Sequence, residues 1–142
     1  MKISTRGRYG LRAMVDIAVH SKDNCITLKS ISLRQGISEN YLEQIISPIK
    51  KAGFVESTRG SQGGYKLSRQ PKEISVGDIL NVLEGSLYAV NCDSDNEADK
   101  CNQGSCSNCA TRPVWEKIYN SLNEVLQSMT LQDLVNDYNN MC

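Results

Sequence analysis

The chain has 142 residues, 39% of them hydrophobic, and its 16 basic residues balance its 16 acidic ones, which is typical of one globular domain with a small appendage. Six cysteines are too few for a disulfide-stapled secreted scaffold, and no apolar run reaches the roughly 18 residues of a membrane span. The N-terminus is polar, unlike a signal peptide, so we expect a cytoplasmic protein with reduced thiols and no membrane contact.

The neutral total charge hides two oppositely charged halves. Residues 1–72 carry thirteen Lys and Arg against five Asp and Glu, a net of +8, whereas residues 73–142 carry three against eleven, a net of −8. This asymmetry is typical of a basic module that meets nucleic-acid phosphates, joined to an acidic module that does not. A chance asymmetry is the alternative.

The first fifty residues predict three helices. Apolar residues recur at three- and four-residue steps over 4–20, which indicates one amphipathic helix. A second helix is expected over 28–35, with Thr27 as its N-cap and Gly36 as its left-handed end, and a third begins after the cap Ser38. A helix, a glycine turn and a second helix form the DNA-binding helix-turn-helix.

A β-hairpin is predicted next. Strand-like residues 54–57 and 65–68 flank a glycine-rich turn that carries Arg59. An arginine on such a hairpin suits insertion into a narrow minor groove, where the negative potential is enhanced. An ordinary hairpin with a solvated arginine is the alternative.

The acidic half predicts a connector helix, an unpatterned loop and a long helix. Ser75 caps the connector helix and Gly85 ends it, Pro113 suits the start of the long helix, and Thr130 caps a short final one. The long helix carries an apolar seam at three- and four-residue steps: Trp115, Ile118, Leu122, Val125 and Met129. We interpret this seam as a homodimer interface rather than a surface covered by the connector helix, since a dimer also suits a palindromic duplex.

Four cysteines gather in the unpatterned loop: Cys92, Cys101, Cys106 and Cys109. Thiolates at this spacing favour an iron–sulfur cluster. A zinc site with Cys92 as fourth ligand and a set of free thiols are the alternatives. Cys25 and Cys142 stand apart, and we assign neither a role.

Several segments together resemble the Rrf2 family of winged-helix regulators. They are residues 1–11, 38–44, 59–65, 83–85 and 115–134, so the resemblance covers nearly the whole chain. The cysteine loop and the segment that follows it, up to Trp115, are similar to the iron–sulfur cluster regulators (IscR) of that family. The N-terminal half is equally similar to its repressors of cysteine metabolism (CymR), a branch without the loop.

The resemblance implies a mainly α protein with a small β-hairpin. Its parts are a winged helix-turn-helix (1–72), a connector helix (73–90), a cluster-binding loop (91–112), and a dimerisation helix followed by a C-terminal helix (113–142). The residues implied in DNA binding are Ser38, Asn40, Tyr41, Glu43, Gln44, Ser57, Arg59 and Gly60. The implied function is a homodimeric regulator that binds a palindromic double-stranded operator under control of a [2Fe–2S] cluster and governs cluster-biogenesis genes.

The chain departs from this pattern at Arg112, where the resemblance places a histidine ligand. Arginine cannot ligate iron, so Cys92 becomes the candidate for the fourth position beside Cys101, Cys106 and Cys109. An all-cysteine set leaves the cluster open between [2Fe–2S], which the resemblance favours, and [4Fe–4S]. A redox or cluster-transfer enzyme is not supported, because the sequence has no nucleophile–base set and no phosphate loop.

Overall fold

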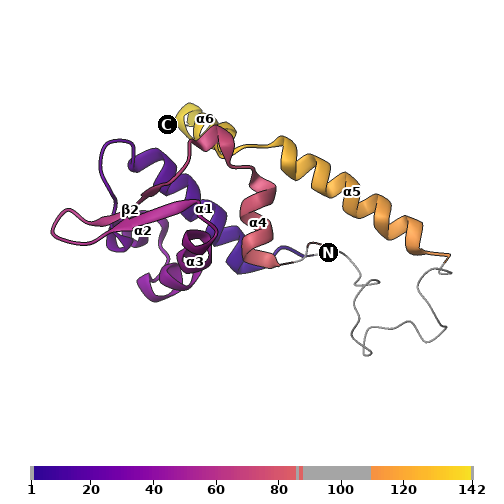
Figure 1. Ribbon diagram of the computed structural model, residues 1–142, viewed down its shortest axis with the longest axis horizontal. Helices are drawn as coiled ribbons and strands as arrows, with labels where there is room; N and C mark the ends of the chain where they lie inside the picture. Colours follow the sequence, from indigo (N-terminus) through magenta and orange to yellow (C-terminus); the bar gives the residue numbers. More distant parts are fainter. Residues whose placement is uncertain (1, 86, 88–109, 142) are drawn as a thin grey trace.

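Six helices and one hairpin make up the described part of the chain, residues 2–85, 87 and 110–141 of a computed structural model. The helices are α1 (Thr5–His20), α2 (Leu28–Gln35), α3 (Glu39–Lys51), α4 (Val76–Glu84), α5 (Arg112–Ser128) and α6 (Leu131–Met141). The strands are β1 (Val55–Thr58) and β2 (Gly64–Leu67), and a 3-10 turn, η1, spans Pro71–Glu73. The prediction of a mainly α protein with a small hairpin is therefore confirmed (Figure 1).

Short polar residues fix the start of each helix in the basic half. The side chains of Ser4, Thr27 and Ser38 each accept a hydrogen bond from the backbone N–H three residues on, and Ser75 does the same for α4. Such caps satisfy donors that the helix itself leaves unpaired. Gly36 ends α2 with φ +67°, a left-handed conformation that glycine adopts without strain. The three helices of this half therefore begin as the sequence predicts.

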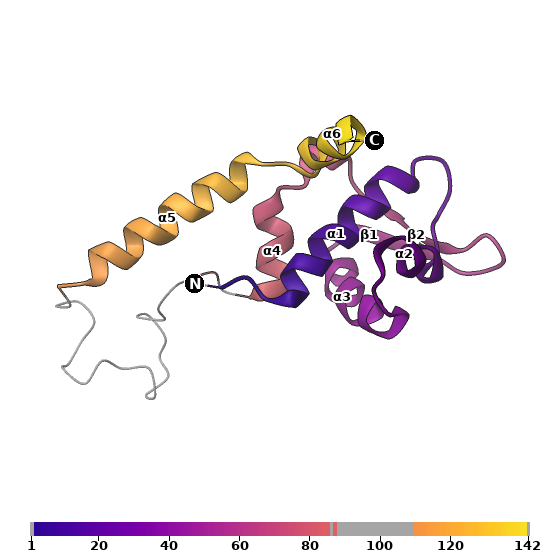
Figure 2. The ribbon, with the colours of Figure 1, turned by 180° about the vertical axis from the view of Figure 1, so that it is seen from behind.

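The core is built around α1, which runs through the body with α2, α3, α4 and α6 packed around it (Figure 2). Met14 and Ile17 of α1 are fully buried, and so are Ile45 and Ile49 of α3. The same cluster takes in Ile74, Ile79, Leu83, Leu131 and Val135. The core of the basic half thus continues into α4 and α6, which hold the helix-turn-helix from behind.

Two glycines let α1 and α4 approach closely. A Cβ at Gly10 would lie 2.1 Å from Cδ1 of Leu83, and one at Gly7 would lie 2.1 Å from Oε1 of Glu84. That Glu84 carboxylate accepts hydrogen bonds from the backbone N–H and the hydroxyl of Ser4, at 3.0 and 2.7 Å. Residues Ser4, Gly7 and Gly10 therefore meet the segment 83–85 in space, at the start of α1.

Backbone pairing ties the α5–α6 junction to the start of α4. The N–H of Val76 donates to the carbonyl of Met129 and that of Leu131 donates to the carbonyl of Ile74, both at 2.8 Å. At the start of α6, Thr130 and Asp133 cap each other reciprocally, as predicted. The position of α6 against the core is therefore fixed by main-chain bonds and by a cap.

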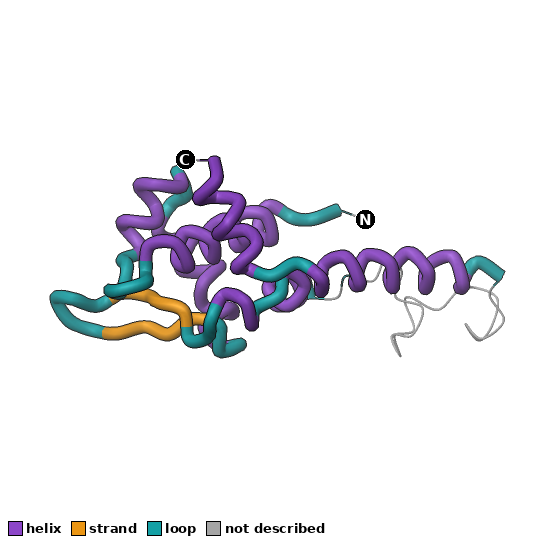
Figure 3. Tube along the Cα trace, turned by 90° about the horizontal axis from the view of Figure 1, so that it is seen from above, coloured by secondary structure: helices purple, strands orange, loops and turns teal. Residues whose placement is uncertain are grey.

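Helix α5 extends away from the body and carries no buried residue (Figure 3). It begins at Arg112, one residue before the predicted Pro113. Only one edge of its apolar sector is covered, where Tyr119 and Leu126 pack against the connector helix α4. Four of the five seam residues are exposed: Trp115 at 36%, Ile118 at 39%, Met129 at 38% and Val125 at 57%.

Candidate nucleic-acid interface

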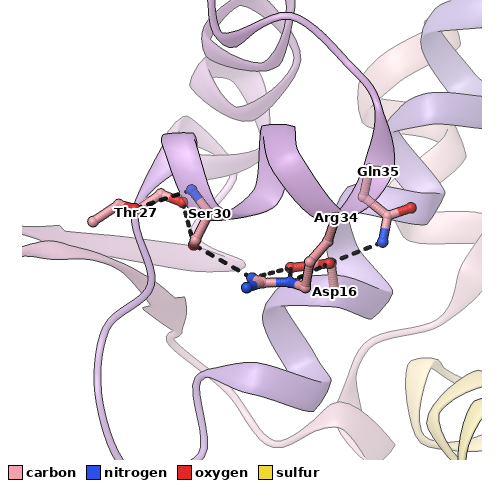
Figure 4. Close-up of polar contacts among 5 residues, drawn as sticks. All are labelled: Asp16, Thr27, Ser30, Arg34 and Gln35. Atoms are coloured by element: carbon pink, nitrogen blue, oxygen red, sulfur yellow. Dashed lines mark hydrogen bonds and ion pairs between the residues drawn. The ribbon is translucent and has the colours of Figure 1, made fainter.

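A buried carboxylate docks the helix-turn-helix on α1. The side chain of Asp16 is 1% exposed and contacts two side chains of α2 (Figure 4). Arg34 forms a bidentate ion pair with it, and the amide of Gln35 donates a 2.8 Å hydrogen bond to it. The shortest Arg34–Asp16 distance is 2.7 Å. These hydrogen bonds to Asp16 raise the pKa of the Arg34 guanidinium above its ordinary value, against the opposing effect of burial.

The same guanidinium links this pair to the cap of α2. Nη2 of Arg34 lies 3.3 Å from the hydroxyl of Ser30, which itself donates to the carbonyl of Thr27 at 2.7 Å (Figure 4). The N-cap, the last turn of α2 and the middle of α1 are thereby joined in one network. No local pattern in the sequence predicts this network, because Asp16 and Arg34 lie 18 residues apart on different helices.

Helix α3 is amphipathic, and its outer face is polar. Leu42, Ile45, Ile46 and Ile49 are buried, whereas Asn40, Glu43 and Gln44 are exposed. The predicted contacts Asn40, Glu43 and Gln44 share one hollow of about 700 Å³ that is also lined by Arg6, Ser47, Pro48 and Lys51. A polar helix face with cations at its borders is suited to base edges flanked by phosphates.

Four residues of this hollow, Arg6, Ser47, Pro48 and Lys51, were not predicted as contacts. Ser47 and Lys51 continue the spacing of Asn40 and Gln44 by one and two helical turns, so extending the helical period would have found them. Arg6 lies on α1, and only the packing of α1 against α3 brings it to the recognition helix.

Ser38 and Tyr41, two further predicted contacts, also have structural tasks. The hydroxyl of Ser38 accepts the backbone N–H of Tyr41 at 3.3 Å, which caps α3. The half-buried ring of Tyr41 meets the ring of Tyr9 edge-on at 6.0 Å, and the guanidinium of Arg12 lies 5.5 Å from the centre of the Tyr9 ring. Ser38 therefore fixes the start of α3, and Tyr41 packs this end of α3 against α1.

The wing forms as predicted, with an additional partner. Strands β1 and β2 pair antiparallel, and Ile26 forms an isolated β-bridge to β2 by exchanging backbone hydrogen bonds of 2.9 and 2.7 Å with Tyr65. A Cβ at Gly64, where φ is +146°, would lie 2.3 Å from the carbonyl oxygen of Ile26. Glycine is therefore required where the loop before α2 crosses the wing.

The remaining predicted contacts, Ser57, Arg59 and Gly60, are exposed on β1 and in the turn of the wing. Across the strands, Lys66 pairs with Glu56 at 3.1 Å, and this hydrogen bond raises the pKa of the Lys66 ammonium above its ordinary value. Since Arg59 makes no hydrogen bond or ion pair to the described residues, its charge is free to meet a phosphate or a groove.

The predicted metal ligands Cys92, Cys101, Cys106 and Cys109 lie outside the described residues. Within the described ranges, no group of three or more His, Cys, Asp or Glu side chains is placed to hold a metal ion. Arg112 donates to Glu116 on the next turn of α5 at 2.7 Å. Cys25 is a half-buried free thiol whose sulfur lies 3.7 Å from the hydroxyl of Thr58, the last residue of β1 before the turn of the wing.

No helix in the described ranges is both long and apolar enough to cross a lipid bilayer.

Sequence similarity to known proteins supports the interpretation of these elements as a winged helix-turn-helix. The Rrf2 family model, described as an iron-dependent transcriptional regulator, matches residues 3–137. CymR of Bacillus subtilis is 43% identical over 134 residues, which are 94% of this chain and 89% of that protein. IscR of Vibrio campbellii is 37% identical over 137 residues, which are 96% of this chain and 79% of that protein.

Two solved structures extend this similarity to the fold. The structure of CymR, described as the global cysteine regulator of B. subtilis, superimposes with a TM-score of 0.77 at 42% identity, covering 96% of this chain and 97% of that one. IscR of T. potens gives a TM-score of 0.75 at 47% identity, covering 97% and 88%. The winged-helix interpretation of α2, α3 and the hairpin is therefore confirmed.

Proposed function

Because the chain belongs to the Rrf2 family of transcriptional regulators, we propose that it binds a palindromic operator as a homodimer and that an iron–sulfur cluster modulates this binding. The observation that carries the DNA proposal is the exposed polar face of α3, bordered by Arg6 and Lys51. Its relatives are transcriptional regulators and not enzymes.

Each side chain of the interface has a distinct task in this proposal. Gln44 pairs with an adenine edge, and Glu43 accepts from a cytosine amine while penalising other bases by repulsion. Arg6 and Lys51 hold the phosphates on either side of the groove, which fixes the register of α3 without reading sequence. Arg59 enters the adjacent minor groove from the wing.

The apolar seam of α5 supports a homodimer. An exposed row of Trp115, Ile118, Val125 and Met129 is costly in water, and its pairing with a second copy removes this area from solvent. A two-fold dimer also presents two copies of α3 to successive half-sites of a palindrome. The dimer would therefore bind both half-sites of one operator at the same time.

The cluster part of the proposal depends on the chemistry of the donors. Cys101, Cys106 and Cys109 supply three thiolates within nine residues, and Cys92 supplies a fourth. Arg112, whose head group is engaged with Glu116, is not a ligand. We favour a [2Fe–2S] cluster over a [4Fe–4S] cluster. When bound, it would let the protein sense the redox state and the supply of clusters. The regulated genes would then be those of cluster biogenesis. Zinc held by the same thiolates is the alternative cofactor.

The colour of the anaerobically purified protein tests the cofactor. We expect a red-brown product with visible absorbance, equal amounts of iron and sulfide, and loss of both in Cys106→Ser. Cys25→Ser is the matched control and should keep its colour, because this thiol contacts Thr58 of the wing and is not one of the proposed ligands. A colourless protein with one zinc per chain would refute the cluster.

Modulation is tested by comparing cluster-loaded and cluster-free protein on the same DNA. Operators are first selected from a random duplex pool, so no sequence is assumed. We expect the two forms to differ in affinity by tenfold or more on at least one selected class of site. Equal affinities on every class would remove the sensing proposal while leaving DNA binding intact.

Control of cysteine and sulfur metabolism is the second candidate function. It is favoured by the similarity to B. subtilis CymR, which covers 94% of this chain at 43% identity. Genome-wide mapping of the DNA bound in cells separates the two candidates. Occupancy at cluster-assembly promoters supports the first, and occupancy confined to cysteine uptake and synthesis promoters supports the second.

A further inference from the structure

A pocket at the base of the wing contains none of the predicted DNA contacts. We call it the wing-base pocket: a hollow of about 620 Å³ between the end of α1, the exit of β2 and α6. Its polar residues are Ser21, Lys22, Lys66, Arg69, Gln132, Asn136 and Asn139. Helices α6 and α3 lie on opposite sides of α1, so the pocket faces away from the recognition helix (Figure 2).

The chemistry of the wing-base pocket is one-sided. Cations occupy the α1 and wing side, amides occupy the α6 side, and no carboxylate lines the hollow. The floor is apolar, with Ala18 at 4% exposure and Val135 at 2%. The volume lies in the range of small-molecule sites, and the mostly polar lining suits a polar ligand.

The amides are notable because α6 belongs to the acidic half. Its carboxylates point elsewhere: Asp133 caps the helix through the N–H of Thr130, and Asp137 lines a different groove between α1 and α6. The pocket side of the helix presents positions 132, 135, 136 and 139, which share one face. This face therefore offers hydrogen bonds without negative charge.

The positive charge of the pocket is only partly neutralised by its surroundings. Lys66 is paired with Glu56 at 3.1 Å, and the carbonyls at the end of α1 add a partial negative charge. The guanidinium of Arg69 lies 5.5 Å from the centre of the Phe54 ring, which orients it without neutralising it. Lys22 and Arg69 leave two uncompensated positive charges at one side of the hollow.

We propose that the wing-base pocket binds a small organic anion bearing carboxylate or phosphate groups. Lys22 and Arg69 pair with its acidic groups, while Asn136 and Asn139 donate hydrogen bonds to its remaining oxygen atoms. Because Lys66 and Arg69 belong to the wing and its exit, an occupied pocket links the wing to α6. An effect of the anion on DNA affinity is a second step that rests on the proposed function.

Calorimetric titration of the full chain with citrate, succinate and inorganic phosphate, at ionic strength matched with chloride, tests the pocket. We expect saturable binding of at least one probe, weakened tenfold or more in Lys22→Gln and Arg69→Gln, since each removes a charge-assisted contact. Asn136→Asp, which adds a carboxylate to the rim, should weaken it as well. The control Lys2→Gln/Lys117→Gln removes two positive charges outside the pocket and should bind as the unmodified chain does.

Two results would overturn the proposal: no saturable binding of any probe, or equal weakening in the control. DNA affinity is then compared with and without the bound probe. A protein that binds the anion but no DNA would contradict the proposed function and not the pocket.

Discussion

Arg34→Met should destabilise the fold far more than its partial exposure suggests. The substitution leaves the Asp16 carboxylate, 1% exposed, with the Gln35 amide as its only remaining partner among the contacts described above. Breaking a buried pair from one side costs about 3–5 kcal/mol, and because the Arg34 side chain is 34% exposed we expect the lower end, about 3 kcal/mol.

Substituting the other member of the pair, Asp16, should lower the free energy of unfolding by less. Asp16→Asn keeps the shape and an acceptor oxygen, and the released Arg34 guanidinium can reach water, so we expect a loss of about 1–2 kcal/mol. Lys66→Met is the matched control, because Lys66 is 46% exposed and its partner Glu56 is 52% exposed. A surface pair of this kind contributes far less to stability than a buried one.

Urea unfolding followed by far-UV circular dichroism measures these three free energies. With a slope of about 1–3 kcal/mol per molar urea, Arg34→Met should lower the midpoint by about 1–3 M. All variants are compared at one protein concentration, because the midpoint of a dimer depends on it. If Arg34→Met cost no more than Lys66→Met, burial of Asp16 would not be what makes the Arg34–Asp16 pair strong.

Three other changes test the remaining surfaces. Gly64→Ala should cost more than about 2 kcal/mol in the same urea assay, because its Cβ would collide with the Ile26 carbonyl, whereas Gly60→Ala, at positive φ but with open space, should cost about 1 kcal/mol; equal losses would contradict the crossing. Arg59→Ala should weaken binding to a selected operator and reduce the slope of log affinity against log salt by about one, measured by fluorescence anisotropy; an unchanged slope would remove the wing from the interface. Val125→Asp should convert the dimer to a monomer in sedimentation velocity, because it places a charge in the apolar seam; a persistent dimer would place the interface elsewhere.

Much of the fold was predictable because its signals are local. Ser4, Thr27 and Ser38 mark helix starts by a hydrogen bond that spans three residues, and Gly36 marks an end by a conformation that it alone adopts freely. The amphipathic period of α3 separates its core face from its exposed face. Asn40, Glu43 and Gln44 could therefore be placed on one surface before any tertiary contact was known.

The seam of α5 shows where such reasoning ends. Its apolar period predicts that the face must be covered, but a period carries no information about which element covers it. The structure assigns one edge, Tyr119 and Leu126, to the connector helix and leaves Trp115 and Val125 exposed. The homodimer is thus a proposal that these exposed residues support.

The sequence by itself determined the helix boundaries, the glycine turn, the opposed charges of the two halves and the cysteine-rich loop, because each depends on residues close together in the chain. Only the tertiary structure decided that Asp16 pairs with Arg34, that Arg6 lies beside α3, and that Glu84 accepts the hydrogen bonds of Ser4 at the start of α1. It also brought Lys22, Arg69 and Asn136 to one pocket. These are pairings between distant segments, and they are fixed by how helices pack in three dimensions, which no local pattern records.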